Sequence, residues 1–405
     1  MVCQEIHSGT SLRGCCLNRI GFASKGSKRL KDDLVQARNC EGMSDRTVNI
    51  LGDCFADQLN SILFMTALRI AVLGCGFWSR FQIPAWQEID GVNCVAVCDL
   101  DAEKSRAVAS RFNIQENYTD AAKLLNSVRP DAVDIVTDPQ SHAELVELAC
   151  SHNISIICQK PMATDFATAE KMVRMCDEQN VTFFVHENWR WQEPIRELKR
   201  VLDSQEIGRP FHARVDFNCS FPVFKNQPSL RKLPELILAD LGVHILDAVR
   251  FLFGEAERLT CQIHRVNSGI AGEDVATVLL AMENGMTVSC NLSFASRLKL
   301  ERFPETFIVV ECNEGSVELA PDYWVRTTNN KETRSSRHPP TLYPWADPNY
   351  AVVHASIVGC HRNLAGALRG TGRAETTGVD NLETLRLVFA AYKSARANQT
   401  VELKK

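Results

Sequence analysis

The sequence predicts a two-domain protein: an α/β domain of the Rossmann type, with a doubly wound parallel sheet, followed by an α+β domain with an open, mainly antiparallel sheet. Three observations predict this. The 405 residues are too many for one ordinary core. From about residue 68 to residue 185, short apolar runs alternate with helix-like stretches, as in a parallel sheet that helices cover on both faces. Beyond residue 210, short strand-like runs separated by tight-turn residues predominate, as in antiparallel sheets.

The first domain is expected over residues 67–187. Its predicted strands are continuous apolar runs at residues 68–73, 93–98, 132–136, 154–158 and 181–185. The predicted helices follow the glycine turn up to residue 88, cover residues 101–111 and 141–151, and run to about residue 178 with Thr164 as N-cap.

The second domain is expected over residues 188–405, with a C-terminal helix that could pack back on the first domain. Its predicted strands are residues 212–217, 258–264, 276–282, 287–293, 306–311 and 316–320. Its predicted helices are residues 194–202, 233–252, 352–369 and 380–397. The polar stretch 327–340 is expected to be a loop.

Residues 1–64 lack a sustained helical or strand period, so we expect a poorly structured N-terminal extension. Residues 25–31 are basic and the first thirty residues hold one acid, Glu5, which leaves a targeting peptide open. We favour a non-structural extension ahead of Met65.

Composition excludes several classes of protein. The net charge of −4 without a long basic run gives no reason to expect nucleic-acid binding. No apolar run reaches the ~18 residues of a membrane span. The sixteen cysteines are scattered, without CxxC pairs of the metal-binding kind, so we expect no metal site and a reducing, cytoplasmic setting. The expected partner is a small-molecule substrate.

The turn Gly74-Cys75-Gly76-Phe77-Trp78-Ser79 follows the first predicted strand and opens a helix. Gly74 allows a tight turn, Gly76 lets the backbone approach a pyrophosphate at the helix N-terminus, and the small Ser79 stands at the usual third glycine. A glycine pattern alone also fits a purely structural turn. Its place in a βαβ unit predicts dinucleotide binding, with these candidate cofactor-binding residues: Gly74, Gly76, Phe77, Trp78 and Ser79.

Asp99 ends the second predicted strand, where a carboxylate accepts hydrogen bonds from the adenosine ribose hydroxyls. The same charge repels a 2′-phosphate, and no arginine follows it at Leu100 or Asp101. We therefore expect NAD to be favoured over NADP.

Lys160 follows a predicted strand at the carboxyl edge of the sheet, where ligands bind in such folds. It could hydrogen-bond a substrate hydroxyl above the nicotinamide. A solvated loop lysine is the alternative that the local motif leaves open.

Asp240 and His244 are one helical turn apart and share a face with Asp247. Oxidation of an alcohol requires a base for the hydroxyl proton, and histidine titrates in the useful range. A neighbouring carboxylate would orient this base. A buried histidine with an intrahelical hydrogen bond is the alternative.

Together these motifs resemble those of the Gfo/Idh/MocA family over about residues 68–403. The family's Glu-Lys-Pro motif falls on Gln159-Lys160-Pro161, with glutamine in place of glutamate, and its Asp-x-x-x-His pair falls on Asp240 and His244. The resemblance implies a Rossmann domain and an α+β domain whose open sheet often serves oligomerisation, so we expect a homo-oligomer.

The resemblance also implies further binding residues. Residues 137–142 are similar to the family's loop beside the cofactor, and residues 186–190 resemble the segment that joins its domains. The candidates that it adds are Thr137, Pro139, His142, Gln159 and Lys160 for the cofactor and Asn188, Arg190, Asp240 and His244 for the substrate.

The expected activity is reversible oxidation of a secondary alcohol of a sugar, inositol or related polyol, with hydride passing to NAD. His244 would take the hydroxyl proton, Asp240 would orient it, and Lys160 would polarise the oxygen and could relay the proton. Two alternatives share the fold: a glycoside hydrolase with tightly held NAD, and a non-catalytic ligand sensor. Aglycone release without net NADH would indicate the hydrolase, whereas retention of all three residues argues against the sensor.

Overall fold

The computed structural model describes residues 67–219, 223–297 and 305–403. The predicted N-terminal extension over residues 1–64 lies outside this part of the chain. Within the described residues, no helix is long and apolar enough to cross a membrane.

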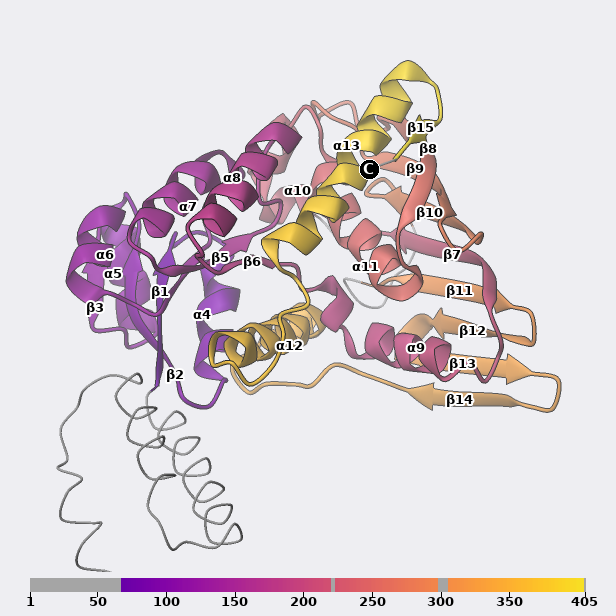
Figure 1. The fold of residues 1–405 in the computed structure, drawn as a ribbon, viewed down its shortest axis with the longest axis horizontal. Coiled ribbons are helices and arrows are strands. Elements are labelled where there is room, and N and C mark those ends of the chain that lie inside the picture. Colours follow the sequence, from indigo (N-terminus) through magenta and orange to yellow (C-terminus); the bar gives the residue numbers. More distant parts are fainter. Residues whose placement is uncertain (1–66, 220–222, 298–304, 404–405) are drawn as a thin grey trace, which may run out of the picture. The chain divides into compact units, whose positions relative to one another are not determined.

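The first sheet has six parallel strands in the order β3-β2-β1-β4-β5-β6 (Figure 1). They are β1 (Leu68–Leu73), β2 (Val92–Cys98), β3 (Glu116–Tyr118), β4 (Ala132–Ile135), β5 (Ser155–Gln159) and β6 (Phe183–His186). The strand order reverses between β1 and β4, and a crevice for a ligand forms at such a reversal, beyond the carboxyl ends of the strands. The predicted Rossmann-type sheet is confirmed, and the short strand β3 is an addition to it.

Helices cover both faces of this sheet, because alternate residues of each strand point to opposite sides. Ala71 and Leu73 pack in one core with α6, α7 and α8, while Ile70 and Val72 face α4, α5 and α12. The helices are α4 (Ser79–Gln87), α5 (Ala102–Arg111), α6 (Ala121–Val128), α7 (His142–Ser151) and α8 (Phe166–Glu178).

The predicted N-cap of α8 is wrong by one residue. The backbone N–H of Thr168 donates to the carboxylate of Asp165 at 2.9 Å, so Asp165 and not Thr164 caps the helix. A carboxylate is as effective a cap as a hydroxyl and adds a favourable charge at the helix N-terminus.

The second sheet has nine strands in the order β14-β13-β12-β11-β7-β10-β9-β8-β15. Among the strands that the structure describes in this sheet, only β7 and β10 pair in parallel, so the predicted mainly antiparallel sheet is confirmed. The strands are β7 (Pro210–Asn218), β8 (Ala256–His264), β9 (Val275–Met282), β10 (Thr287–Ser293), β11 (Phe307–Cys312), β12 (Gly315–Ala320), β13 (Trp324–Asn329), β14 (Thr333–Arg337) and β15 (Val401–Glu402).

The loop predicted over residues 327–340 is wrong, because β13 and β14 form a hairpin there. Every side chain of β14 is exposed. An edge strand with no buried face carries no alternation of apolar and polar residues, which is the signal by which strands are predicted.

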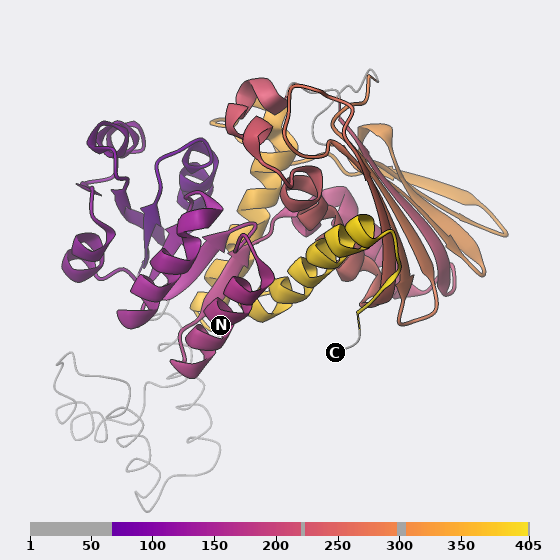
Figure 2. The ribbon, with the colours of Figure 1, turned by 90° about the horizontal axis from the view of Figure 1, so that it is seen from above.

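Helices cover one face of the nine-stranded sheet (Figure 2). The described helices that follow β6 are α9 (Glu193–Ser204), α10 (Val223–Asn226), α11 (Val243–Phe253), α12 (Ala351–Leu368) and α13 (Gly378–Ala397). Short 3-10 turns lie at η1 (Pro139–Ser141), η2 (Trp189–Trp191), η3 (Pro228–Lys232), η5 (Pro321–Tyr323) and η6 (Pro348–Tyr350). The helix predicted from residue 233 to residue 252 begins later, and the π-helical turn η4 (Leu238–Gly242) precedes α11.

The last part of the chain returns to the first sheet. α12 packs against α4, where the ring of His361 stacks on the ring of Trp86 with centroids 3.6 Å apart. The core at this place joins Ile70 and Phe81 to Val353 and Ile357 of α12. α13 also packs against α8 and β6. The dinucleotide half is therefore completed by residues far beyond its last strand.

Candidate active site

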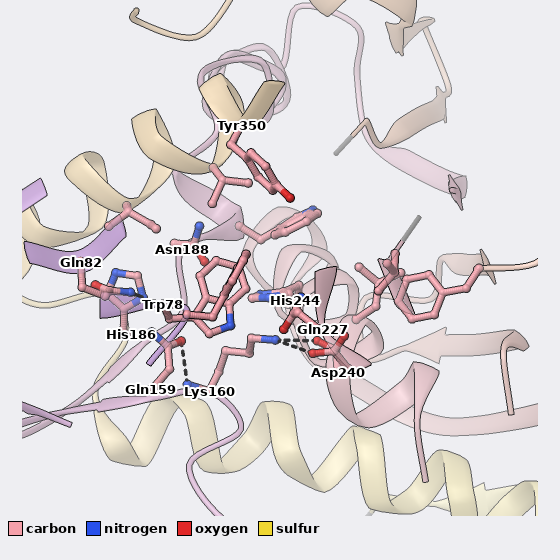
Figure 3. Close-up of a pocket in the computed structure, with 17 residues that line it drawn as sticks. Trp78, Gln82, Gln159, Lys160, His186, Asn188, Gln227, Asp240, His244 and Tyr350 are labelled. Atoms are coloured by element: carbon pink, nitrogen blue, oxygen red, sulfur yellow. Dashed lines mark hydrogen bonds and ion pairs between the residues drawn. The ribbon is translucent and has the colours of Figure 1, made fainter. Parts of the chain in front are cut away.

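A pocket opens at the carboxyl edge of the six-stranded sheet (Figure 3). Its walls come from the glycine turn, the ends of β5 and β6, the π-helical turn with α11, and α12. The residues that line it are Phe77, Trp78, Gln82, Gln159, Lys160, His186, Asn188, Trp189, Val223, Gln227, Asp240, Leu241, His244, Phe294, Tyr350, Val353 and Ile357.

The two glycines of the turn have different environments. Gly74 has a φ of +106°, and a Cβ there would lie 2.6 Å from the carbonyl oxygen of Val136, so the fold itself requires glycine. A Cβ on Gly76 would meet nothing within 4 Å. Gly76 is exposed just ahead of α4, and Ser79 Oγ donates to its carbonyl oxygen at 2.8 Å. Open space beside a helix N-terminus fits a pyrophosphate.

Asp99 lies at the end of β2 next to this turn. Its Oδ2 accepts the backbone N–H of Cys75 at 2.8 Å, and its Oδ1 accepts the N–H of Asp101 at 2.9 Å. The carboxylate is half-buried and fixed beside the glycine turn. This is the place and charge that suit an adenosine ribose.

The loop after β4 lies against the same turn. Thr137 Cγ2 is 3.0 Å from the position that a Cβ of Gly74 would take, and Pro139 begins η1. His142 is buried, with Nε2 3.1 Å from the carbonyl oxygen of Thr137 and Nδ1 3.2 Å from that of Pro161. His142 does not line the pocket; it joins the loop after β4 to the segment that follows Lys160.

Lys160 and Asp240 meet in the pocket. Lys160 Nζ donates to Asp240 Oδ1 at 3.0 Å and to the Asp240 carbonyl oxygen at 2.8 Å. The lysine side chain is 9% exposed, so the alternative of a solvated loop lysine is wrong. The preceding Gln159 is buried, and its Oε1 accepts the backbone N–H of Lys160 at 3.1 Å. Glutamine thus supplies an oxygen acceptor without the charge of glutamate.

The expectation that Asp240 orients His244 does not fit the contacts of the two side chains. His244 Nδ1 lies 2.5 Å from Oε1 of Glu187, while the carboxylate of Asp240 bonds Lys160. The sequence prediction did not include Glu187. Its position directly after β6, at the same edge of the sheet as Lys160, could have indicated a site residue. Glu187, 57 positions away in the chain, is the partner of His244 in place of Asp240. Asp240 lies in a π-helical turn, so the regular α-helical spacing between it and His244 is broken.

His244 is enclosed by protein. The Trp189 ring stacks on it, with centroids 4.5 Å apart and planes 20° from parallel. Burial, and then the charge of Lys160, hold the pKa of His244 well below its usual value. The imidazole is therefore neutral at pH 7 and can accept a proton.

Asn188 and Arg190, two of the four residues expected to bind substrate, have separate places. Asn188 lines the pocket, and its Nδ2 donates to Ser356 Oγ at 2.6 Å. Arg190 does not line the pocket; its guanidinium is buried and bonds Asp247 at 2.6 Å and Asp380 at 3.0 Å. Asp247 is thus the hydrogen-bonded partner of Arg190, and it affects His244 through its charge.

The pocket therefore combines the ammonium group of Lys160, the neutral imidazole of His244 and the carboxyl group of Asp240, with the carboxyl group of Glu187 behind the imidazole. Such a set can polarise a hydroxyl oxygen and accept its proton. Within the described ranges, no group of three or more His, Cys, Asp and Glu side chains is arranged to hold a metal ion.

Comparison with known families gives two matches. Residues 68–187 match the oxidoreductase family with an NAD-binding Rossmann fold, GFO_IDH_MocA. Residues 195–318 match the GFO/IDH/MocA C-terminal domain. The two matches follow one another along the chain in the same order as its two sheets.

Individual relatives are similar over most of the chain. A D-apiose dehydrogenase of Paraburkholderia graminis is 46% identical over 351 residues, which are 86% of this chain and 94% of that protein. One of Rhizobium rhizogenes is 40% identical over 339 residues, 84% of this chain and 98% of that protein. A crystal structure of an oxidoreductase from Agrobacterium radiobacter in complex with NAD+, L-tartaric acid and magnesium is 40% identical, covers 84% of this chain and 99% of its own, and has a TM-score of 0.82. The chain therefore belongs to the Gfo/Idh/MocA family and is an NAD-dependent oxidoreductase.

Proposed function

We propose that the protein is a dehydrogenase that oxidises a secondary alcohol of a small sugar or related polyol, with D-apiose as the first candidate substrate. The observation that carries this proposal is that Lys160, Asp240 and His244 line one pocket with the glycine turn. The two D-apiose dehydrogenases, 46% and 40% identical, support a sugar as substrate.

The cofactor NAD supplies the acceptor for the hydride. Gly74, Gly76 and the N-terminus of α4 would hold its pyrophosphate, with Phe77 and Trp78 beside it at the pocket wall. Asp99 would bind the ribose hydroxyls and disfavour a 2′-phosphate. Thr137 and Pro139, in the loop beside Gly74, are further candidate contacts.

His244 would take the proton of the substrate hydroxyl, because it is neutral and its Nδ1 is already bonded, which leaves Nε2. Lys160 would donate a hydrogen bond to the same oxygen and stabilise the negative charge that develops there. Asp240 would keep the ammonium group in place through their 3.0 Å contact. This division of roles revises the expectation that Asp240 orients His244.

The remaining walls suit a sugar. Trp78, Trp189, Phe294 and Tyr350 present aromatic rings, on which the C–H groups of a sugar can pack. Asn188 and Gln227 add amide groups that can bond its hydroxyls. An apolar pocket with a few convergent polar groups is the usual form of a small-molecule site.

The test is NADH formation by the purified full-length protein with D-apiose, other pentoses, hexoses, inositols and sugar acids, each at the same concentration. We expect absorbance at 340 nm to rise with D-apiose or a related small sugar, and to require Lys160. Aglycone release from glycosides without net NADH would replace the proposal by the hydrolase alternative. Binding of sugars without either reaction would replace it by the sensor alternative.

We further infer a homo-oligomer formed through the face of the nine-stranded sheet opposite its helices. Leu279, 49% exposed on β9, stands on this face, which also carries Val309 of β11 and Trp324 of β13. Apolar groups on an open face favour association. Light scattering after gel filtration measures the mass; Leu279→Lys should lower it towards that of one chain, and a monomeric wild type would contradict the inference.

We also propose a cytoplasmic location. The eleven cysteines within the described ranges are all free, and all but Cys94 are buried. Many unpaired thiols suit a reducing compartment. A fluorescent fusion of the full chain would contradict this location if it collected in an organelle or outside the cell.

A further inference from the structure

A buried carboxyl group, Glu187, lies behind the proposed base. Its Oε1 is 2.5 Å from His244 Nδ1 and accepts the backbone N–H of Trp189 at 3.1 Å. The side chain is fully buried and does not line the pocket. Its Oε2 has no hydrogen-bond partner among the described residues. A buried carboxyl with one unsatisfied oxygen is costly and calls for an explanation beyond stability.

The titratable groups around Glu187 come from five segments. Lys160 follows β5, Arg190 lies in η2, Asp247 and His244 belong to α11, and Asp380 opens α13. From α12, the thiol of Cys360 donates to the Glu187 carbonyl oxygen at 3.8 Å. Burial raises the pKa of Glu187 to about 7, although Lys160 and Arg190 oppose this rise. Its proton is therefore exchangeable near neutral pH.

The hydrogen-bond pattern decides which nitrogen of His244 carries a proton. Oε1 of Glu187 already accepts the Trp189 N–H, so an ionised Glu187 acts as an acceptor towards His244 as well. Nδ1 of a neutral His244 then carries the hydrogen, and Nε2 keeps its lone pair. If Glu187 were protonated and donated to Nδ1, Nε2 would carry the hydrogen and could not act as a base.

We propose that Glu187 is a positioning residue for the proton transfer: it holds His244 with its hydrogen on Nδ1 and stabilises the imidazolium that forms. This inference rests on the proposed dehydrogenase function. In the forward reaction the substrate O–H bond breaks and an Nε2–H bond forms on His244. The carbon loses hydride to the NAD+ of the established activity, and a C=O bond forms. Asp240 cannot share this role, because its carboxylate bonds Lys160.

The first test is Glu187→Gln, with Glu147→Gln on the exposed side of α7 as the matched control. An amide keeps the size of the side chain and removes its charge. We expect kcat to fall by about 10²-fold, since the amide also permits the wrong tautomer, while the Kd for NAD stays within about twofold. The control should keep the wild-type kcat.

The pH profile separates positioning from packing. The carboxylate raises the proton affinity of His244, so its loss lowers the pKa of the imidazole, and the acid limb of kcat moves to lower pH. A role in folding alone would lower the yield of active enzyme without moving this limb. A Glu187→Gln enzyme with the acid limb at the wild-type pH overturns the proposal.

A second measurement uses the wild type and does not depend on the folding of the variant. In protein labelled with 15N-histidine, the His244 signals, assigned by their loss in His244→Gln, should show a hydrogen on Nδ1 and none on Nε2. The opposite tautomer overturns the role of Glu187. Wild-type turnover of His244→Gln contradicts the proposed function itself, whereas an inactive His244→Gln beside a fully active Glu187→Gln contradicts only the role of Glu187.

Discussion

Lys160 and Asp240 are held together by two contacts, of 3.0 Å to the carboxylate and 2.8 Å to the backbone carbonyl oxygen. They stand 80 positions apart in the chain, one after β5 of the first sheet and one in the π-helical turn before α11. The pair joins the two halves of the protein at the pocket. Because the ammonium group is nearly buried, this contact fixes where Nζ lies relative to a substrate.

A double-mutant cycle tests this pair. Lys160→Met should lower kcat by about 10²–10⁴-fold, as expected for loss of acid-base help. Asp240→Asn should lower it by about tenfold, and the double variant should be no worse than Lys160→Met, since residues that act through one another are not additive. Lys171→Met, on an exposed position of α8, is the control. Additive losses in kcat would show that Asp240 acts independently of Lys160.

The two glycines of the turn should respond differently to alanine. Gly74→Ala forces a Cβ against the Val136 carbonyl oxygen at a φ of +106°, which should cost at least about 1–3 kcal/mol of folding free energy. Gly76→Ala places its methyl group in open space, so the melting temperature should be unchanged. Its Kd for NAD should rise by at least about tenfold, because the methyl group stands where the pyrophosphate approaches. Calorimetric titration measures the Kd for NAD, and thermal melting measures the stability of each variant. Normal NAD affinity in Gly76→Ala would contradict the assigned site.

The charge of Asp99 should determine the choice of cofactor. Asp99→Asn keeps an oxygen for the Cys75 N–H and removes the negative charge. We expect the ratio of kcat/KM for NADP to that for NAD to rise by about tenfold or more, since a like-charge repulsion is lost. Glu103→Gln, exposed on α5, serves as the comparison. An unchanged ratio would mean that another residue rejects the 2′-phosphate.

Asp134 should make stability depend on pH. Its carboxyl is fully buried, accepts the indole N–H of Trp86 at 2.8 Å, and has its pKa raised by burial from 3.8 to about 7. The unfolded chain loses this proton first, so the contribution of Asp134 to stability falls as pH rises from about 4 to about 7 and is constant above. The full change corresponds to about 4 kcal/mol, at about 1.4 kcal/mol for each tenfold change in proton affinity.

Asp134→Asn removes this titration and keeps an acceptor for Trp86. The melting temperature of the variant should therefore exceed that of the wild type, by more at pH 8 than at pH 5. Thermal melts of both proteins at these pH values measure the difference. A difference that shrinks as pH rises would contradict the assigned direction of the pKa.

Local sequence was enough to predict the turn at Gly74 and Gly76, the carboxylate Asp99 and the lysine after β5. Each depends on a strand end and the few residues that follow it, so neighbours in the chain determine the structure. The prediction of an NAD-dependent oxidoreductase is confirmed by the family match and by the NAD+ complex of a relative 40% identical to this chain.

The pairing of side chains could not be predicted in the same way. Helical spacing placed His244 beside Asp240, yet its partner is Glu187 from another segment. The spacing rule assumes a regular helix, and η4 is not one. The partner of a buried nitrogen depends on tertiary packing. Local patterns in a single sequence do not reveal that packing. Arg190 was likewise expected at the substrate and instead bonds carboxylates on two helices.

The packing of α12 on α4 has a consequence for synthesis of the protein on the ribosome. The strands of the first sheet are all made by residue 186, but the apolar surface around Phe81 and Trp86 also packs against α12 and the residues just before it, which are made much later. A nascent chain that has just emerged to residue 187 therefore exposes an incomplete core, and should depend on chaperones or aggregate. The NAD site is therefore complete only when translation has nearly ended. A chain that terminates before α12 should not bind NAD.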